Sequence, residues 1–81
     1  MFVSHDLESS AFLWARGARF LGVEPSPTTE NPNHVVFRFY DPNGLCRHEV
    51  FAFQKGAGIA AQHYAIALKH LKEQVFRRIL R

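Results

Sequence analysis

Acid–base or metal-assisted catalysis requires carboxylates and histidines that converge on one point. His48 and Glu49 are adjacent on a predicted strand, so their side chains point to opposite faces and do not chelate one ion together. The acidic residues are scattered over every predicted element: Asp6, Glu8, Glu24, Glu30, Asp41, Glu49 and Glu73. We therefore predict that the protein is not an enzyme and has no catalytic residues.

The other histidines and the single cysteine give no better centre. His63 and His70 are seven residues apart, a rise of about 10.5 Å along a helix. That separation is too large for both to bind one metal ion at a nitrogen distance of about 2 Å. Cys46 shares a strand face with His48 but lacks a third group to orient the base, so a packed thiol is favoured over a nucleophile. No metal site and no cofactor are predicted.

A glycine-rich segment precedes the last predicted helix. The backbone amides of Gly56, Ala57 and Gly58 could hold a phosphate at the start of that helix, and Lys55 adds positive charge. The segment lacks the spacing of a Walker or dinucleotide-binding motif, so a plain hinge is favoured.

The most informative pattern is a basic ridge on the outer face of the last predicted helix, where a His or Arg recurs every seven residues. Such a ridge could follow a phosphate backbone, because Lys and Arg contacts release counterions. Arg16 and Arg19 could extend it. The alternative is a solvated helix face whose basic C-terminal end complements the helix dipole. The predicted nucleic-acid-binding residues are His63, His70, Arg77, Arg78, Arg81 and Lys55.

A second predicted surface consists of residues without obvious cover. Val36, Arg38 and Tyr40 are expected on the sheet face that the helices leave open, and Ile66 on the outward side of the last helix. Phe12 is a further apolar residue that needs cover. Aromatic and arginine side chains together suit a partner protein, a second copy of the chain or unstacked bases.

Local signals place these residues on five elements. Ser4 or Asp6 can cap a helix that Gly17 ends. Prolines stop the next strand, and the segment 41–44, Asp-Pro-Asn-Gly, predicts a turn into a returning antiparallel strand whose alternation is uneven. The predicted order is a helix over 7–16, a strand over 19–24, a loop over 25–33, strands over 34–40 and 45–54, and a helix from the hinge 56–58 to Arg81.

The last helix carries an apolar stripe that is predicted to cover the sheet. Its members recur at three- and four-residue spacing: Ala61, Tyr64, Leu68, Leu71, Val75 and Ile79, widened by Ala65, Phe76 and Leu80. The resulting fold class is α+β, a two-layer α-β-β-β-α arrangement whose three-stranded antiparallel sheet has both helices on one face.

Length and composition limit the chain to one small domain over residues 1–81. It is 47% hydrophobic, carries a formal net charge of +3 and has one cysteine. The start of the chain predicts no signal peptide, and no apolar run is long enough to span a bilayer. A reducing compartment, the cytoplasm, is the expectation, without membrane association. At this size a homodimer could contribute part of the stability.

The spacing of core positions resembles an uncharacterised family of short phage and bacterial domains, a domain of unknown function. The resemblance covers most of the chain: Phe2, Ser4, Asp6-Leu7, Ala11-Phe12-Leu13, Gly17, 20–24, 35–39, Ile59, Ala60-Ala61, Tyr64, Ala67-Leu68 and Leu71-Lys72. The segments 25–33 and 41–48 look longer here. The resemblance implies a setting in phage or other mobile-element genomes and brings no catalytic residue or cofactor.

Two functional hypotheses follow. The leading one is a non-enzymatic accessory module of a phage or mobile element that associates with nucleic acid or a nucleic-acid-handling complex through the basic ridge. The alternative is a protein-interaction module, either a homodimer or a phage-encoded inhibitor or adaptor of a host protein, that uses the exposed apolar residues.

Overall fold

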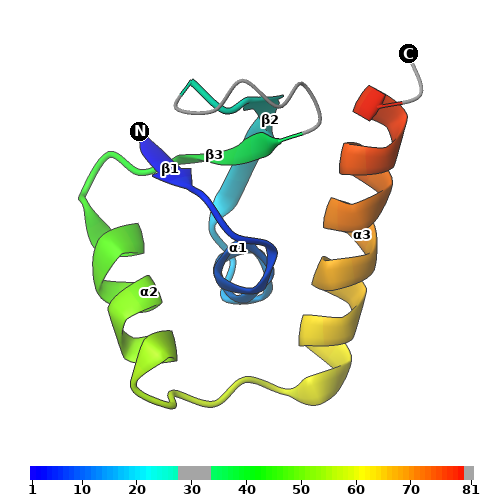
Figure 1. The fold of residues 1–81 in the computed structure, drawn as a ribbon. Helices are drawn as coiled ribbons and strands as arrows, with labels where there is room; N and C mark the ends of the chain where they lie inside the picture. The colour runs from blue at the N-terminus through cyan, green and yellow to red at the C-terminus, as the bar shows by residue number, and fades with distance from the viewer. Residues whose placement is uncertain (28–33, 80–81) are drawn as a thin grey trace.

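Three strands and three helices make up the part of the chain that the computed structural model describes, residues 1–27 and 34–79 (Figure 1). In chain order they are β1 (Phe2–Ser4), α1 (Leu7–Ala15), β2 (Arg19–Pro25), β3 (Val35–Tyr40), α2 (Leu45–Gln54) and α3 (Ala61–Ile79). Strand β2 includes Pro25, the first residue of the predicted loop 25–33, and residues 28–33 of that loop lie outside the described residues. None of the described helices has the length and apolar character that a bilayer crossing requires.

The strands form one antiparallel sheet in the order β1-β3-β2. Phe39 of β3 pairs with Phe2 on one side and with Phe20 on the other. A bulge interrupts the β2–β3 ladder between Phe20 and Gly22, and Gly22 has a φ of +149°, which a glycine adopts most easily. The predicted α+β class and three-stranded antiparallel sheet are confirmed, but the third strand is β1 at the N-terminus.

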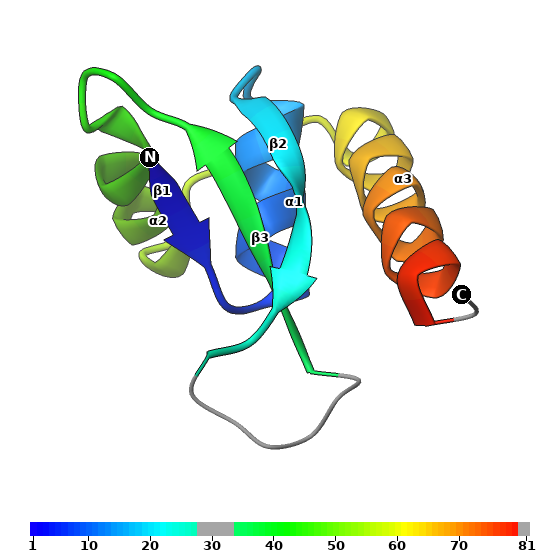
Figure 2. The ribbon, with the colours of Figure 1, turned by 90° about the horizontal axis from the view of Figure 1, so that it is seen from above.

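The helices lie on one face of this sheet. Figures 1 and 2 both place α1 beneath the strands, with α2 on one side of it and α3 on the other. Along the chain the elements run β-α-β-β-α-α, so the predicted order α-β-β-β-α was wrong.

Helix α1 begins at Leu7, as predicted, and ends at Ala15, one residue before the predicted end. The Oδ2 atom of Asp6 accepts a hydrogen bond from the backbone N–H of Ser9 at 2.9 Å, which makes Asp6 the N-cap. Ser4, the other candidate cap, is buried instead, and its Oγ lies 2.7 Å from the Oγ of Ser10. Gly17 follows the helix with a φ of +96°.

The segment 45–54, predicted as a strand, is helix α2. Asp41 Oδ1 accepts hydrogen bonds from the backbone N–H groups of Leu45 at 2.8 Å and Cys46 at 3.2 Å, which satisfies two amides of the first helical turn. Gly44 takes a left-handed φ of +68° just before the helix. Asp-Pro-Asn-Gly therefore works as a helix start, although the same residues are typical of a hairpin turn.

The apolar residues of α2 confirm the helical period. Cys46, Val50 and Phe53 are spaced by four and three residues and lie on one side of the helix, toward the core. The Phe53 ring stacks on Phe12 of α1 with centroids 4.7 Å apart. Phe12 is fully buried, so α2 covers the side chain for which the sequence analysis found no packing partner.

The apolar stripe of α3 packs chiefly on α1 and only secondarily on β2. Leu71 is fully buried, whereas Tyr64, Leu68 and Val75 are half-buried beside the core. The prediction that Phe76 widens this stripe was wrong, because its side chain is 63% exposed. The buried core comprises Ala11, Leu13, Val35, Phe37, Phe39, Cys46, Ala67 and Leu71.

We expect Asp41→Ala to lower the free energy of unfolding by about 1 kcal/mol, because two N–H groups of α2 lose their acceptor. Urea denaturation followed by circular dichroism measures the change. Asp41→Asn retains an acceptor oxygen at this position and is the matched control. If Asp41→Asn lowered the free energy of unfolding as much as Asp41→Ala, the capping role would be contradicted.

Candidate nucleic-acid interface

Helix α3 carries the net charge of the chain. Residues 61–79 contain four Lys or Arg residues and one Glu, so they account for the whole formal net charge of +3, and the remaining residues are balanced. The four basic residues are Lys69, Lys72, Arg77 and Arg78. The positive electrostatic potential of the protein is therefore concentrated on one helix.

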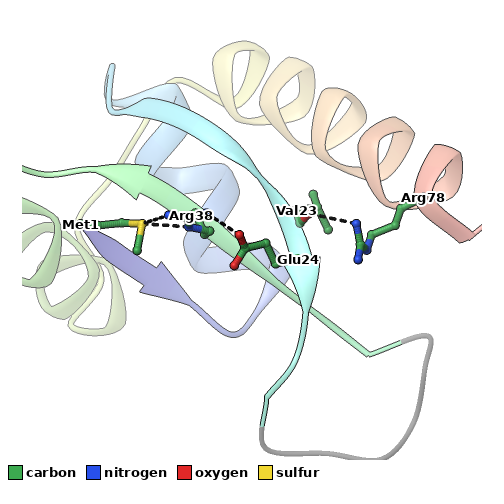
Figure 3. A network of polar contacts seen from close by, with 5 residues as sticks. All are labelled: Met1, Val23, Glu24, Arg38 and Arg78. Atoms are coloured by element: carbon green, nitrogen blue, oxygen red, sulfur yellow. Dashed lines mark hydrogen bonds and ion pairs between the residues drawn. The ribbon is translucent and has the colours of Figure 1, made fainter.

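The ion pairs of the described residues lie away from this helix. Arg16 Nε is 2.9 Å from Glu49 Oε2, and Arg38 pairs with Glu24 on the sheet (Figure 3). Within residues 1–27 and 34–79, no acidic side chain forms an ion pair with the Lys and Arg residues of α3. Their positive charge is thus available to an external anion.

Two of the predicted binding residues come together at the C-terminal end of α3. Arg77 and Arg78 are exposed and, with Gln74, flank a shallow hollow of about 300 Å³ beside Val23 of the edge strand β2. Arg78 Nη1 donates a hydrogen bond to the Val23 carbonyl oxygen at 3.4 Å (Figure 3). Arg81, also predicted, lies outside the described residues.

The two histidines do not continue this cluster. The His70 ring stacks on Trp14 of α1, with centroids 5.6 Å apart and planes 15° apart, so the ring is engaged with the neighbouring helix although the residue stays exposed. His63 is exposed but precedes Arg77 by fourteen residues, about 21 Å along the axis. The predicted heptad ridge is therefore divided, and only its C-terminal end is concentrated.

Lys55 was predicted to extend the ridge, and the structure places it elsewhere. It follows the last residue of α2, and its Nζ lies 4.6 Å from the centre of the Phe51 ring. In Figures 1 and 2, α2 is on the opposite side of α1 from α3. Lys55 cannot contact the same phosphates as the end of α3.

The glycine segment after α2 is a helix cap. The N–H of Gly56 donates to Phe53 O at 3.0 Å, and the N–H of Ala57 donates to Ala52 O at 2.9 Å. These two bonds satisfy the last carbonyls of α2, as in a Schellman motif. Both amides are thereby engaged, so the segment does not form a phosphate cradle.

The predicted partner surface on the sheet is only partly accessible. Val36 is 3% exposed, so its expected place on an open face was wrong. Arg38 is held by Glu24, and its Nε and Nη2 lie 2.8 and 2.6 Å from Met1 Sδ (Figure 3). Tyr40 is 53% exposed, and Ile66 on α3 is 50% exposed.

Cys46 has the environment of a packing residue. It is buried on the core side of α2. The pKa of its thiol is raised to about 11, chiefly by this burial and further by the nearby Asp41 carboxylate. At neutral pH the thiol is protonated and a poor nucleophile. Within residues 1–27 and 34–79, no three His, Cys, Asp or Glu side chains are grouped closely enough to hold a metal ion.

A feature that the sequence analysis missed is a groove on the other flank of α3. Two neighbouring hollows, of about 610 and 430 Å³, share Lys72 and Phe76. The signal was present in the sequence, because Phe76 follows Leu71 by five residues and so lies about 140° from it around the helix. A residue so far from the buried Leu71 cannot belong to the same narrow stripe.

The resemblance to an uncharacterised phage and bacterial family stays a prediction. Comparisons with family models, with curated proteins and with solved structures found no match. Several residues that carry the resemblance, such as Ala11, Leu13 and Leu71, are buried in the core. The shared pattern therefore concerns packing rather than a binding site.

We expect Cys46 to react with a thiol reagent at pH 8 at least about a hundredfold more slowly in the folded protein than in denaturant. The pKa is raised from 9.0 to about 11, so the folded state holds about a hundredfold less thiolate at any pH below 9, and burial slows access further. Ellman's reagent gives both rates. Folded and unfolded rates within tenfold of each other would contradict the buried, protonated thiol.

Proposed function

We propose that this protein is a non-enzymatic accessory module that associates with nucleic acid, or with a complex that handles nucleic acid, through the C-terminal end of α3. The observation that carries the proposal is the concentration of the whole net charge on α3, without an ion pair to any described acidic residue. The resemblance to phage and bacterial domains supports a setting in a mobile element, and the single cysteine supports a cytoplasmic one.

Side chains must supply the attraction for phosphate at this site. The C-terminal end of a helix carries a partial negative charge, which opposes an anion. Arg77 and Arg78 overcome it because each brings a full positive charge on a long side chain that can reach past the last turn. Gln74 beside them adds an amide donor. Contacts of this kind are independent of sequence and strongly dependent on salt.

A second function is favoured by a different observation. Phe76 and Ile66 of α3 are 63% and 50% exposed, and an apolar groove adjoins Phe76. Exposed apolar residues beside an apolar groove are typical of protein-interaction surfaces. The alternative function, a protein-interaction module, therefore rests on another flank of the same helix.

The salt dependence of binding tests the nucleic-acid proposal. We expect labelled DNA or RNA to bind at 50 mM salt and to lose about 12-fold in affinity at 200 mM, the change for the two phosphates that Arg77 and Arg78 neutralise. Fluorescence anisotropy measures both affinities. Absence of binding at 50 mM would refute the proposal.

Charge reversal locates the interface. We expect R77E together with R78E to weaken binding at 50 mM salt by at least about tenfold, because both phosphate contacts become repulsive. R47E in α2 together with K55E directly after it is the matched control, since the pair changes the net charge equally on the opposite side of the molecule. Equal losses in the two variants would show that net charge alone, and not the end of α3, governs binding.

A further inference from the structure

We propose that the groove beside Phe76 binds an acidic amphipathic helix of a partner protein. This Phe76 groove is defined by Ala65, Leu68, Lys72, Val75 and Phe76 of α3, with Leu7, Val35 and Phe37 next to them. Phe76 and Arg78 lie about 160° apart around the helix, so the groove and the basic end proposed for nucleic acid face different directions and share Arg77 at their border.

The smaller hollow of the groove has a firm apolar floor and an exposed apolar wall, whereas the larger hollow is lined by α3 alone. Val35 and Phe37 belong to the buried core, and Leu7 and Val75 are half-buried against it. Phe76 stands above them with 63% of its surface exposed. Because the floor is part of the core, the groove exists before a partner arrives, and binding needs little ordering of the protein.

The dimensions suit a helix of about three turns. Ala65, Leu68, Lys72 and Phe76 follow one another at spacings of three and four residues over about 16 Å of α3. A partner helix with apolar residues at i, i+3 or i+4, i+7 and i+11 presents a stripe of the same length. The lining consists of side chains rather than free strand backbone, which favours a helix over an added strand.

The charge of the rim selects the partner. Lys69, Lys72 and Arg77 border the larger hollow with one acid, Glu73. Lys72 and His34 border the smaller hollow, which has no acidic residue in its described lining. Glu or Asp residues flanking the apolar stripe of a partner would therefore meet positive charge on both sides.

A second copy of the chain is a poor occupant for the same reason. In a two-fold dimer built on this groove, the same surface of each copy meets, so the three basic residues of both rims, Lys69, Lys72 and Arg77, would gather at one interface with only one acid from each copy, Glu73. Like charges placed together across an interface are repulsive. The basic rim thus disfavours the homodimer and favours an acidic partner.

Selection from a display library of random 16-residue peptides, with the full-length protein as bait, tests the proposal. We expect the enriched peptides to be acidic, with apolar residues at helical spacing. A consensus peptide should bind with an affinity reduced at least about tenfold by F76S or by K72E. I66S is the matched control, because Ile66 is equally apolar and exposed but does not line the groove. Circular dichroism of each variant verifies folding.

The outcomes are distinct from those of the nucleic-acid test. Enriched peptides without net acidic charge or without helical spacing would overturn the proposal, as would full binding by F76S. A concentration-dependent dimer in sedimentation that F76S abolishes would assign the groove to a second copy. Loss of nucleic-acid binding in F76S, with R77E/R78E unaffected, would assign it to nucleic acid. Each of these results contradicts an acidic helix as its occupant.

Discussion

The structure depends on the burial of α1. This nine-residue helix is too short to be stable alone in water, so its tertiary contacts must hold it. Ala11 and Leu13 lie in the core with the sheet, Phe12 stacks on Phe53 of α2, and Trp14 stacks on His70 of α3. Five consecutive residues, 9–13, are buried, which a helix covered on one side only does not allow. Both neighbouring helices are therefore placed by contacts with α1.

Burying a helix on several sides requires that its polar groups be satisfied. Ser9 and Ser10 are buried on α1, and Ser4 is buried on β1. Ser10 Oγ lies 2.7 Å from both Ser4 Oγ and the Asp6 carbonyl oxygen, so its hydroxyl has partners without water. Among the described residues, no buried side-chain nitrogen or oxygen lacks a hydrogen-bond partner. The short strand β1 is thus tied to α1 by hydrogen bonds as well as to β3 by its ladder.

Features set by neighbouring residues could be predicted from the sequence. The Asp6 cap, the Gly17 end of α1 and the alternation of β3 each depend on a few adjacent residues. The identity of α2 did not follow, because Asp-Pro-Asn-Gly starts a hairpin or a helix equally well. Only the packing of Cys46 and Val50 in the core and of Phe53 on Phe12 of α1 decides between them. Strand β1 is three residues long and pairs across the chain with β3, so no local pattern could reveal it.

The binding surfaces also combine features that the sequence alone predicts with features that depend on tertiary packing. The basic character of α3 is a property of composition and could be predicted, but the direction of each side chain depends on where the helix packs. The sequence analysis placed the apolar stripe on the sheet. Because the stripe packs on α1 instead, His70 becomes a stacking residue and Phe76 becomes a surface residue. Because α3 packs chiefly on α1 rather than on the sheet, His70 stacks on Trp14 instead of continuing the basic ridge, and Phe76 borders an apolar groove.

The two flanks of α3 differ in how they can bind. At the basic end, flexible arginines must lose side-chain entropy on contact with a phosphate, so affinity there is modest and depends on salt. At the Phe76 groove, core residues already fix the floor, and covering the exposed part of one Phe contributes about 1–2 kcal/mol. Trp14 holds α3 from the opposite side, through its stacking on His70, which helps the groove keep its shape. A helix fixed on one flank can present the other as a rigid docking surface, while its charged end remains free to reach for phosphate.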